Sequence, residues 1–215
     1  ENVNTKFKVV GNIKVSQFLK DKNFNRLKFM NNINLDSNKN NVLFAPSWNA
    51  HGKNLFRGFR FLPKEYGNQF YVLKKLATQL NLLNCNLIIK LHHASHYYLK
   101  KKFFKKLDNE KNCFIFKTEA NHDIEESNNI IKVSDIIITD TSGVASTGIF
   151  LNKKLIFINP HSHYDWHNSD IEKKLRPGFI CSFFDEILDA VKNYINNQDP
   201  YNEERKKFVE KIFLI

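Results

Sequence analysis

The chain has 215 residues, a formal net charge of +11 and a pI near 9.5. This length fits one large domain or two small ones, and no apolar run reaches the ~18 residues of a membrane-spanning helix. The charge suits nucleic acid, an anionic membrane face or a phosphate-rich substrate. Only five of the 33 basic residues are arginine, which argues against a protein that reads base edges, where arginine dominates.

The first forty residues are expected to lead in from a preceding domain. Residues 7–12 predict a short strand, residues 15–27 have weak helical spacing, and residues 31–40 predict a polar loop. The chain starts at Glu1 rather than at a methionine, and it ends in an apolar helical pattern. We therefore expect it to be a piece of a longer protein.

Strands and helices are predicted to alternate over the rest of the chain. Five short apolar runs predict buried strands at residues 42–45, 87–91, 113–116, 136–138 and 155–158. Amphipathic or capped segments predict helices over residues 65–83, 95–107, 123–133, 143–151 and 184–195, and from residue 199 onward. Such alternation predicts a Rossmann-like, doubly wound parallel sheet with strand order 3-2-1-4-5.

The three cysteines are odd in number and widely spaced, and none forms a CxxC pair. Cys85 and Cys113 fall at or just before apolar runs. We expect buried thiols of a reducing, cytoplasmic compartment.

Polar residues of unusual kinds follow directly after the predicted strands, at residues 47–51, 92–93, 117–122, 140–143 and 159–167. The carboxyl ends of parallel strands share one edge of the sheet, and open α/β sheets bind ligands at that edge. The turn Asp140, Thr141, Ser142 and Gly143 follows three isoleucines and opens a helix. A simple helix cap needs one such residue, whereas this turn has three and a glycine, which favours a phosphate site.

Three motifs stand in one order along the chain: Ala45-Pro46-Ser47-Trp48, then Lys90-Leu91-His92-His93, then the stretch SDIIITDTSGV from Ser134 to Val144. This pattern resembles the nucleotide-binding half of GT-B transferases. More narrowly, it resembles the CDP-glycerol glycerophosphotransferase family of teichoic-acid and capsule polymerases. The likeness covers residues 40–180. His93 stands in place of the family's proline, and Thr141, Ser142 and Gly143 replace its Tyr-Ser-Ser.

The resemblance implies a transferase whose residues 41–198 form the donor-binding domain, with a C-terminal helix over residues 199–215. It implies that His92 is catalytic and stabilises the charge that develops on the leaving nucleotide. The turn would hold the donor's diphosphate. The resemblance also implies that the ribose and base of the donor contact Thr147, Lys117, Thr118 and His122. It implies that a loop facing the cleft between the two domains contains Asn49, His51, Gly52 and Lys53.

The implied partners are CDP-glycerol or a nucleotide-sugar donor, a polymer or lipid-linked acceptor, and an N-terminal acceptor domain that the sequence does not contain. Family members tend to have an acid where Thr147 stands, so the nucleoside is less defined than the phosphates. The fragment is expected to be inactive alone, cytoplasmic, and peripheral at the inner face of the membrane. The resemblance implies no cofactor and no metal. The histidines His161, His163 and His167 have a spacing that could suit zinc, but no cysteine lies near them, which argues against a zinc site.

Two other functions stay open. The first is a UDP- or CMP-sugar glycosyltransferase of capsule or lipopolysaccharide synthesis, which would use the same half-fold. The second is a basic nucleic-acid-binding module. The gathering of polar residues at strand ends, and the lack of a recognition segment rich in arginine or aromatic residues, favour the transferase.

Overall fold

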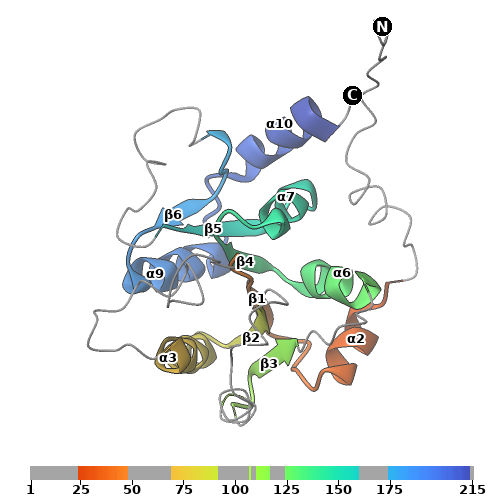
Figure 1. Cartoon of the computed structure of the whole chain (residues 1–215), viewed down its shortest axis with the longest axis vertical. Coiled ribbons are helices and arrows are strands. Elements are labelled where there is room, and N and C mark those ends of the chain that lie inside the picture. The colour runs from red at the N-terminus through yellow and green to blue at the C-terminus, as the bar shows by residue number, and fades with distance from the viewer. Residues whose placement is uncertain are drawn as a thin grey trace, which may run out of the picture.

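The computed structural model describes residues 24–47, 69–91, 107, 110–116, 124–159 and 174–213. These residues form a six-stranded parallel sheet in the order β3-β2-β1-β4-β5-β6 (Figure 1). The strands are β1 (Asn40–Phe44), β2 (Cys85–Lys90), β3 (Cys113–Phe116), β4 (Ile136–Thr139), β5 (Lys154–Ile158) and β6 (Phe179–Cys181). The order of the first five is the predicted one, and β6 is a sixth strand that the sequence analysis did not predict.

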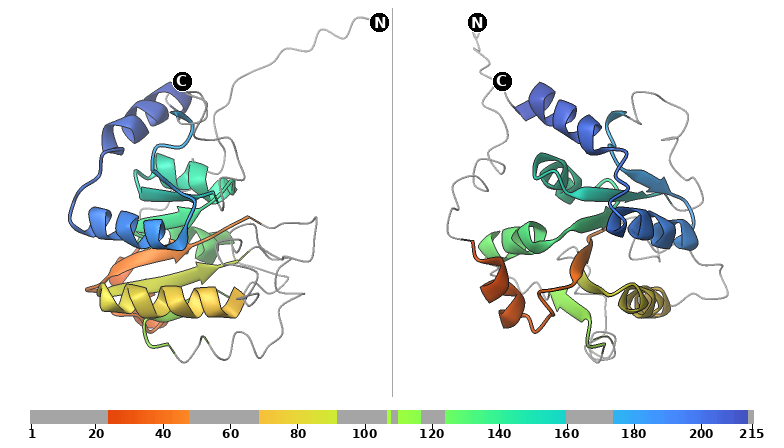
Figure 2. Two further views of the ribbon diagram at one scale, coloured as in Figure 1. Left: turned by 90° about the vertical axis from the view of Figure 1, so that its left-hand side faces the viewer. Right: turned by 180° about the vertical axis from the view of Figure 1, so that it is seen from behind.

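Six described helices cover the two faces of the sheet. They are α2 (Arg26–Asn32), α3 (Gln69–Leu82), α6 (Ile124–Val133), α7 (Gly143–Phe150), α9 (Phe184–Ile195) and α10 (Asn202–Phe213). Helices α3 and α9 lie on one face, and α2, α6 and α7 lie on the other, with α10 outside α7 (Figures 1 and 2). This is the doubly wound Rossmann-like arrangement that the sequence predicts.

The side chains of successive residues in the central strands pack on opposite faces of the sheet. Val42 and Ile138 pack under α3 and α9, whereas Leu43 and Ile137 pack under α6 and α7. All four residues of β4 are buried. A strand covered on both faces must be apolar throughout, which explains the unbroken run of isoleucines.

Helix α2 lies between the segment with weak helical spacing (15–27) and the predicted polar loop (31–40), and it overlaps each of them by two residues. The Asn25 side chain accepts a hydrogen bond from the Lys28 N–H at 2.9 Å and caps the helix. Met30 is fully buried, and Leu35 is 5% exposed. Arg26 forms two hydrogen bonds with the Asp135 carboxylate, at 3.0 and 2.8 Å. Residues of this segment therefore pack against the sheet.

Helix α10 is fastened to the domain through Arg205, which is 1% exposed. Its guanidinium pairs with Asp199 and donates to the Asn152 side chain at 3.0 Å and to the Pro177 carbonyl at 3.4 Å. These bonds join α10 to the end of α7 and to the segment before β6. The C-terminal helix is thus part of the same packed body.

All three cysteines are free, with Cys85 and Cys181 buried and Cys113 half-buried. The strand expected over residues 7–12 lies outside the described residues, as does the helix expected over residues 95–107, apart from Leu107. None of the described helices is both long and apolar enough to cross a membrane.

Candidate functional site

The site is built where β1 and β4 end side by side. Beyond the last paired residues, the Ala45 N–H donates to the Ile138 carbonyl at 2.9 Å. The buried Thr139 hydroxyl donates to the Ala45 carbonyl at 2.8 Å. These two bonds extend the pairing of the strands and bring Ser47 next to the turn that starts at Asp140.

Asp140 lies in the floor of this turn and is 1% exposed. One carboxylate oxygen, Oδ1, accepts the backbone N–H groups of Ser47 at 2.8 Å and Ser142 at 3.1 Å. The other, Oδ2, accepts the Ser47 hydroxyl at 2.7 Å. The sequence predicts that Asp140 binds donor phosphate, but in the structure both of its carboxylate oxygens accept hydrogen bonds from the protein. Its place in the structure is that of an anchor for the turn.

The rest of the turn opens helix α7. Ser142 is the N-cap, with extended backbone (φ −66°, ψ 147°), and its hydroxyl accepts the Val144 N–H at 3.4 Å. A Cβ atom added to Gly143 would meet nothing within 4 Å. Within the described part of the chain, the N–H groups of Thr141 and Gly143 have no acceptor. The turn therefore presents free backbone donors and open space at the positive end of a helix dipole.

No acidic residue occupies the first turn of α7. Many helices place a carboxylate there to complement their own dipole, and such a side chain would compete with a bound anion. Because Thr141 is also exposed, the turn is chemically suited to a phosphate group.

Thr147 lies one turn further along α7 and is 8% exposed. Its expected contact with a ribose stays a prediction. The other predicted site residues lie outside the described residues: His92, Lys117, Thr118, His122, Asn49, His51, Gly52 and Lys53. The strand β2 ends at Lys90 on the same edge of the sheet as the turn, because β2 runs parallel to β1.

Ser47 is the residue whose role the sequence analysis missed. It belongs to the Ala45-Pro46-Ser47-Trp48 motif, but no function was assigned to it. A hydroxyl two residues beyond a buried strand, facing the end of the neighbouring strand, was the available signal.

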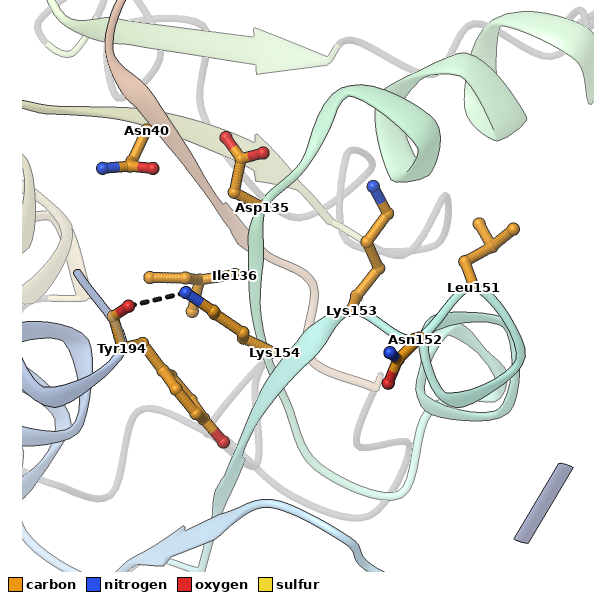
Figure 3. Close-up of a pocket in the computed structure, with 8 residues that line it drawn as sticks. All are labelled: Asn40, Asp135, Ile136, Leu151, Asn152, Lys153, Lys154 and Tyr194. Carbon is orange, nitrogen blue, oxygen red and sulfur yellow. Dashed lines mark hydrogen bonds between the residues drawn. The ribbon is translucent and has the colours of Figure 1, made fainter. Parts of the chain in front are cut away.

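A separate cavity of about 290 Å³ lies at the opposite, amino edge of the sheet (Figure 3). Lys153 donates there to the Lys132 carbonyl at 2.8 Å, and Lys154 donates to the Tyr194 carbonyl at 2.6 Å. Burial lowers the pKa of Lys153. These carbonyls lie at the C-terminal ends of α6 and α9, where a cation complements the helix dipole. The two lysines therefore stabilise helix ends.

Within the described residues, no three histidine, cysteine or acidic side chains lie together in a way that could hold a metal ion. The histidines at positions 161, 163 and 167 lie outside the described residues, so the expectation about them stays a prediction.

Residues 16–214 match the family model for CDP-glycerol:poly(glycerophosphate) glycerophosphotransferase. The chain belongs to this family. The match covers nearly the whole chain and confirms the resemblance that the three motifs indicate. A search among curated protein sequences gives no match.

Solved structures show the same fold as this glycerophosphotransferase-family chain. The wall teichoic acid polymerase TagF is 18% identical with a TM-score of 0.60, and the match covers 94% of this chain and 45% of TagF. E. coli ADP-heptose LPS heptosyltransferase II is 13% identical with a TM-score of 0.54, covering 80% of this chain and 51% of its own. S. aureus MnaA, solved with UDP, is 13% identical with a TM-score of 0.51, covering 82% of this chain and 42% of its own.

These matches confirm the GT-B half-fold. The chain spans less than half the length of TagF.

Proposed function

We propose that this chain is the donor-binding domain of a glycerophosphotransferase that builds a cell-surface polymer such as teichoic acid or capsule. The observation that carries the proposal is the open turn at the start of α7, where Thr141 and Gly143 present free N–H groups beside open space. Such a turn at the carboxyl edge of a doubly wound sheet is where a nucleotide's phosphates bind. Membership of the glycerophosphotransferase family supports this assignment.

The donor is CDP-glycerol in this proposal. TagF, which has the same fold, was soaked with CDPG. The turn holds the diphosphate, and Thr147 with Lys117, Thr118 and His122 contacts the ribose and base. The loop residues Asn49, His51, Gly52 and Lys53 face the cleft where the acceptor arrives.

In the reaction, a hydroxyl of a polymer or lipid-linked acceptor attacks the phosphorus that carries glycerol. A new P–O bond forms, the bond to the nucleotide's phosphate breaks, and CMP leaves. The donor groups of the turn and His92 stabilise the negative charge on CMP, as preorganised N–H groups and a cationic or acidic imidazole do elsewhere. These groups supply the positive charge without a bound metal or other cofactor.

A base that takes the acceptor's proton comes, in this proposal, from the other half of a GT-B enzyme. The chain then binds donor without turnover when it is tested alone. The acceptor brings the enzyme to the inner face of the membrane as a peripheral protein.

A sugar transferase that uses UDP or a CMP-sugar is the second candidate. The heptosyltransferase and the UDP-bound MnaA share this half-fold, and the neutral Thr147 leaves the nucleoside less defined than the phosphates. Nucleic-acid binding is not favoured, because the candidate contacts are backbone N–H groups of a single turn rather than a basic surface that follows a polymer.

Calorimetry with CDP-glycerol, CDP, CMP and UDP tests the proposal. We expect CDP to bind more tightly than CMP, because only a second phosphate extends the contact with the turn. The variants His92→Ala and Ser142→Ala should weaken CDP binding by about three- to tenfold each, the worth of one hydrogen bond. If none of the four nucleotides binds, or if the chain instead binds RNA or DNA with a steep salt dependence, the proposal is wrong.

A further inference from the structure

Strand β4 is flanked by two aspartates, and each accepts a hydrogen bond from a backbone N–H of β1 or of the residues just after it, at opposite edges of the sheet. At the amino edge, Asp135 Oδ2 accepts the Asn41 N–H at 2.8 Å. At the carboxyl edge, Asp140 Oδ1 accepts the Ser47 N–H at 2.8 Å. Each carboxylate therefore fixes one end of the neighbouring strand β1 against β4.

The two aspartates differ in what else they hold. The Asp135 side chain is 30% exposed and is paired with Arg26. Asp140 is almost completely buried, and no cation of the described residues pairs with it. Its partners are instead the hydroxyl of Ser47 and the N–H of Ser142. A buried carboxylate is stable only when its oxygens are satisfied in this way, so these bonds strongly constrain the local geometry.

We propose that Ser47 and Asp140 form a positioning pair that aims the free N–H groups of the turn at the donor's diphosphate. A single oxygen, Asp140 Oδ1, receives the N–H groups of both Ser47 and Ser142, so it ties the end of β1 to the middle of the turn. Thr141 and Gly143 flank Ser142, and the direction of their N–H groups follows from where Ser142 is held. The inference deepens the proposed function and rests on it.

The pair acts through the turn and does not touch the donor. Both Asp140 oxygens are occupied by protein donors, and the side chain is 1% exposed, so Asp140 is neither a phosphate ligand nor a general base. Ser47 presents its hydroxyl to Asp140 at 2.7 Å, which commits that proton to the carboxylate. Their contribution is preorganisation of a hydrogen-bonding site.

The first test compares Ser47→Ala with Thr139→Val. Each variant removes one hydroxyl bond across the same pair of strands, but only the Ser47 bond reaches the turn. Calorimetry with CDP should show a loss of affinity for Ser47→Ala of up to about tenfold, the most that one hydrogen bond holding the turn can contribute. Thr139→Val should show no loss of affinity at equal or greater loss of thermal stability. If affinity falls in both variants in proportion to stability, the pair is merely structural and the inference is overturned.

The second test separates geometry from charge. In Asp140→Asn, the amide oxygen can still accept both N–H groups, and its NH₂ can donate to Ser47 Oγ. We expect Asp140→Asn to bind CDP as tightly as the unmodified chain or more tightly. Asp140→Ala should bind at least tenfold more weakly, and Asp135→Ala, the control at the amino edge, should bind normally. An Asn variant as weak as the Ala variant would contradict a positioning role.

Amide hydrogen exchange without ligand tests the pair independently of donor binding. Ser47→Ala should speed exchange at Ser142, whose N–H is bonded to Asp140, and leave Gly148 in the same helix unchanged; Thr139→Val should change neither. Unaltered exchange at Ser142 in Ser47→Ala would overturn the inference that Ser47 and Asp140 position the turn, whether or not the chain binds nucleotides. Altered exchange in a chain that binds no nucleotide would instead support the pair as an anchor of the turn and refute the proposed donor site.

Discussion

The backbone of three consecutive residues supplies most of the chemistry of the candidate site. Among the described residues, nothing accepts the N–H groups of Thr141 and Gly143. Ser142, between them, caps α7 and is held by Asp140. Backbone donors keep their place when side-chain identity changes. Under the proposed function, the chain can therefore depart from the family's Tyr-Ser-Ser at this turn and still offer backbone donors to a phosphate.

Gly143 allows the site to be tested without disturbing the fold. A Cβ added there meets no atom within 4 Å, so Gly143→Ala should leave the free energy of unfolding unchanged or raise it by at most ~1 kcal/mol, because alanine favours the helix. Under the proposed function, the new methyl group narrows the space beside the donor N–H groups in which the phosphate binds. We expect CDP affinity, measured by calorimetry, to fall by about tenfold or more, as when a charge-assisted hydrogen bond is lost.

Gly148→Ala is the matched control in the same helix. Its Cβ would lie 2.9 Å from Ile137 Cδ1 and 3.0 Å from Leu155 Cδ2. Overpacking of this kind should lower the free energy of unfolding by about 1–3 kcal/mol and leave CDP affinity unchanged. Equal loss of affinity in the two variants would refute the assignment of the space above Gly143 to the phosphate.

Two buried thiols predict a loss of stability in alkaline solution. Burial raises the pKa of Cys85 from 9.0 to about 11 and, with the nearby Glu186, that of Cys181 to about 12. Above pH 9 the unfolded chain loses these protons while the folded chain keeps them. The free energy of unfolding should therefore fall as pH rises, by up to about 1.4 kcal/mol per pH unit for each thiol.

Denaturant unfolding at pH 8 to 10.5 measures this effect. The unmodified chain should lose more stability over that range than the double variant Cys85→Ala/Cys181→Ala. Lys153, whose pKa burial lowers, acts in the opposite direction in both proteins and cancels in the comparison. Parallel pH profiles would contradict the assignment of the thiols.

At the scale of elements, four helices end in the same way. Asn34, Asn84, Asn152 and Asn197 have positive φ, between 50° and 59°, and each lies just past the end of α2, α3, α7 or α9. After three of these helices, a second bond closes the motif, as from the Lys153 N–H to the Gly148 carbonyl at 2.8 Å. Glycine usually fills this left-handed position, and asparagine is the side chain that tolerates it best.

One of these asparagines does more than end a helix. The Asn152 side-chain oxygen accepts a hydrogen bond from Arg205 Nε at 3.0 Å, and its NH₂ group donates one to Asn202 Oδ1 at 2.9 Å. We expect Asn152→Gly to lower the free energy of unfolding by about 1–2 kcal/mol, because the buried Arg205 loses a partner. Asn197→Gly, where no side-chain bond is lost, should raise it by up to ~1 kcal/mol. Thermal unfolding compares them, and equal shifts would show that α10 is not held through Asn152.

At the scale of the whole molecule, strong apolar periodicity made much of the fold predictable. The structure gives β3 and α9 the bounds that the sequence predicted, because a compact apolar run and a regular helical stripe leave little choice. Helix α2 and strand β6 were missed for the same physical reason. Seven residues and three residues are too short to show a period, and their place is fixed by tertiary contacts such as those of Met30.

The sequence predicts where the candidate site lies better than it predicts the role of each residue in the site. Parallel topology puts strand ends on one edge, so the turn after β4 followed from the sequence. The direction of a side chain does not follow from topology, and Asp140, expected to contact phosphate, in fact points into the protein. Ser47 was missed because its partner lies 93 residues away.

Binding of CDP to the ¹⁵N-labelled chain, followed by amide chemical shifts, tests the central claim most directly. We predict that the largest changes occur at Thr141, Ser142 and Gly143, with none at Asn152, Lys153 and Lys154 around the amino-edge cavity. Changes centred on that cavity, or no changes at the turn at saturating CDP, would contradict a donor phosphate site at the start of α7.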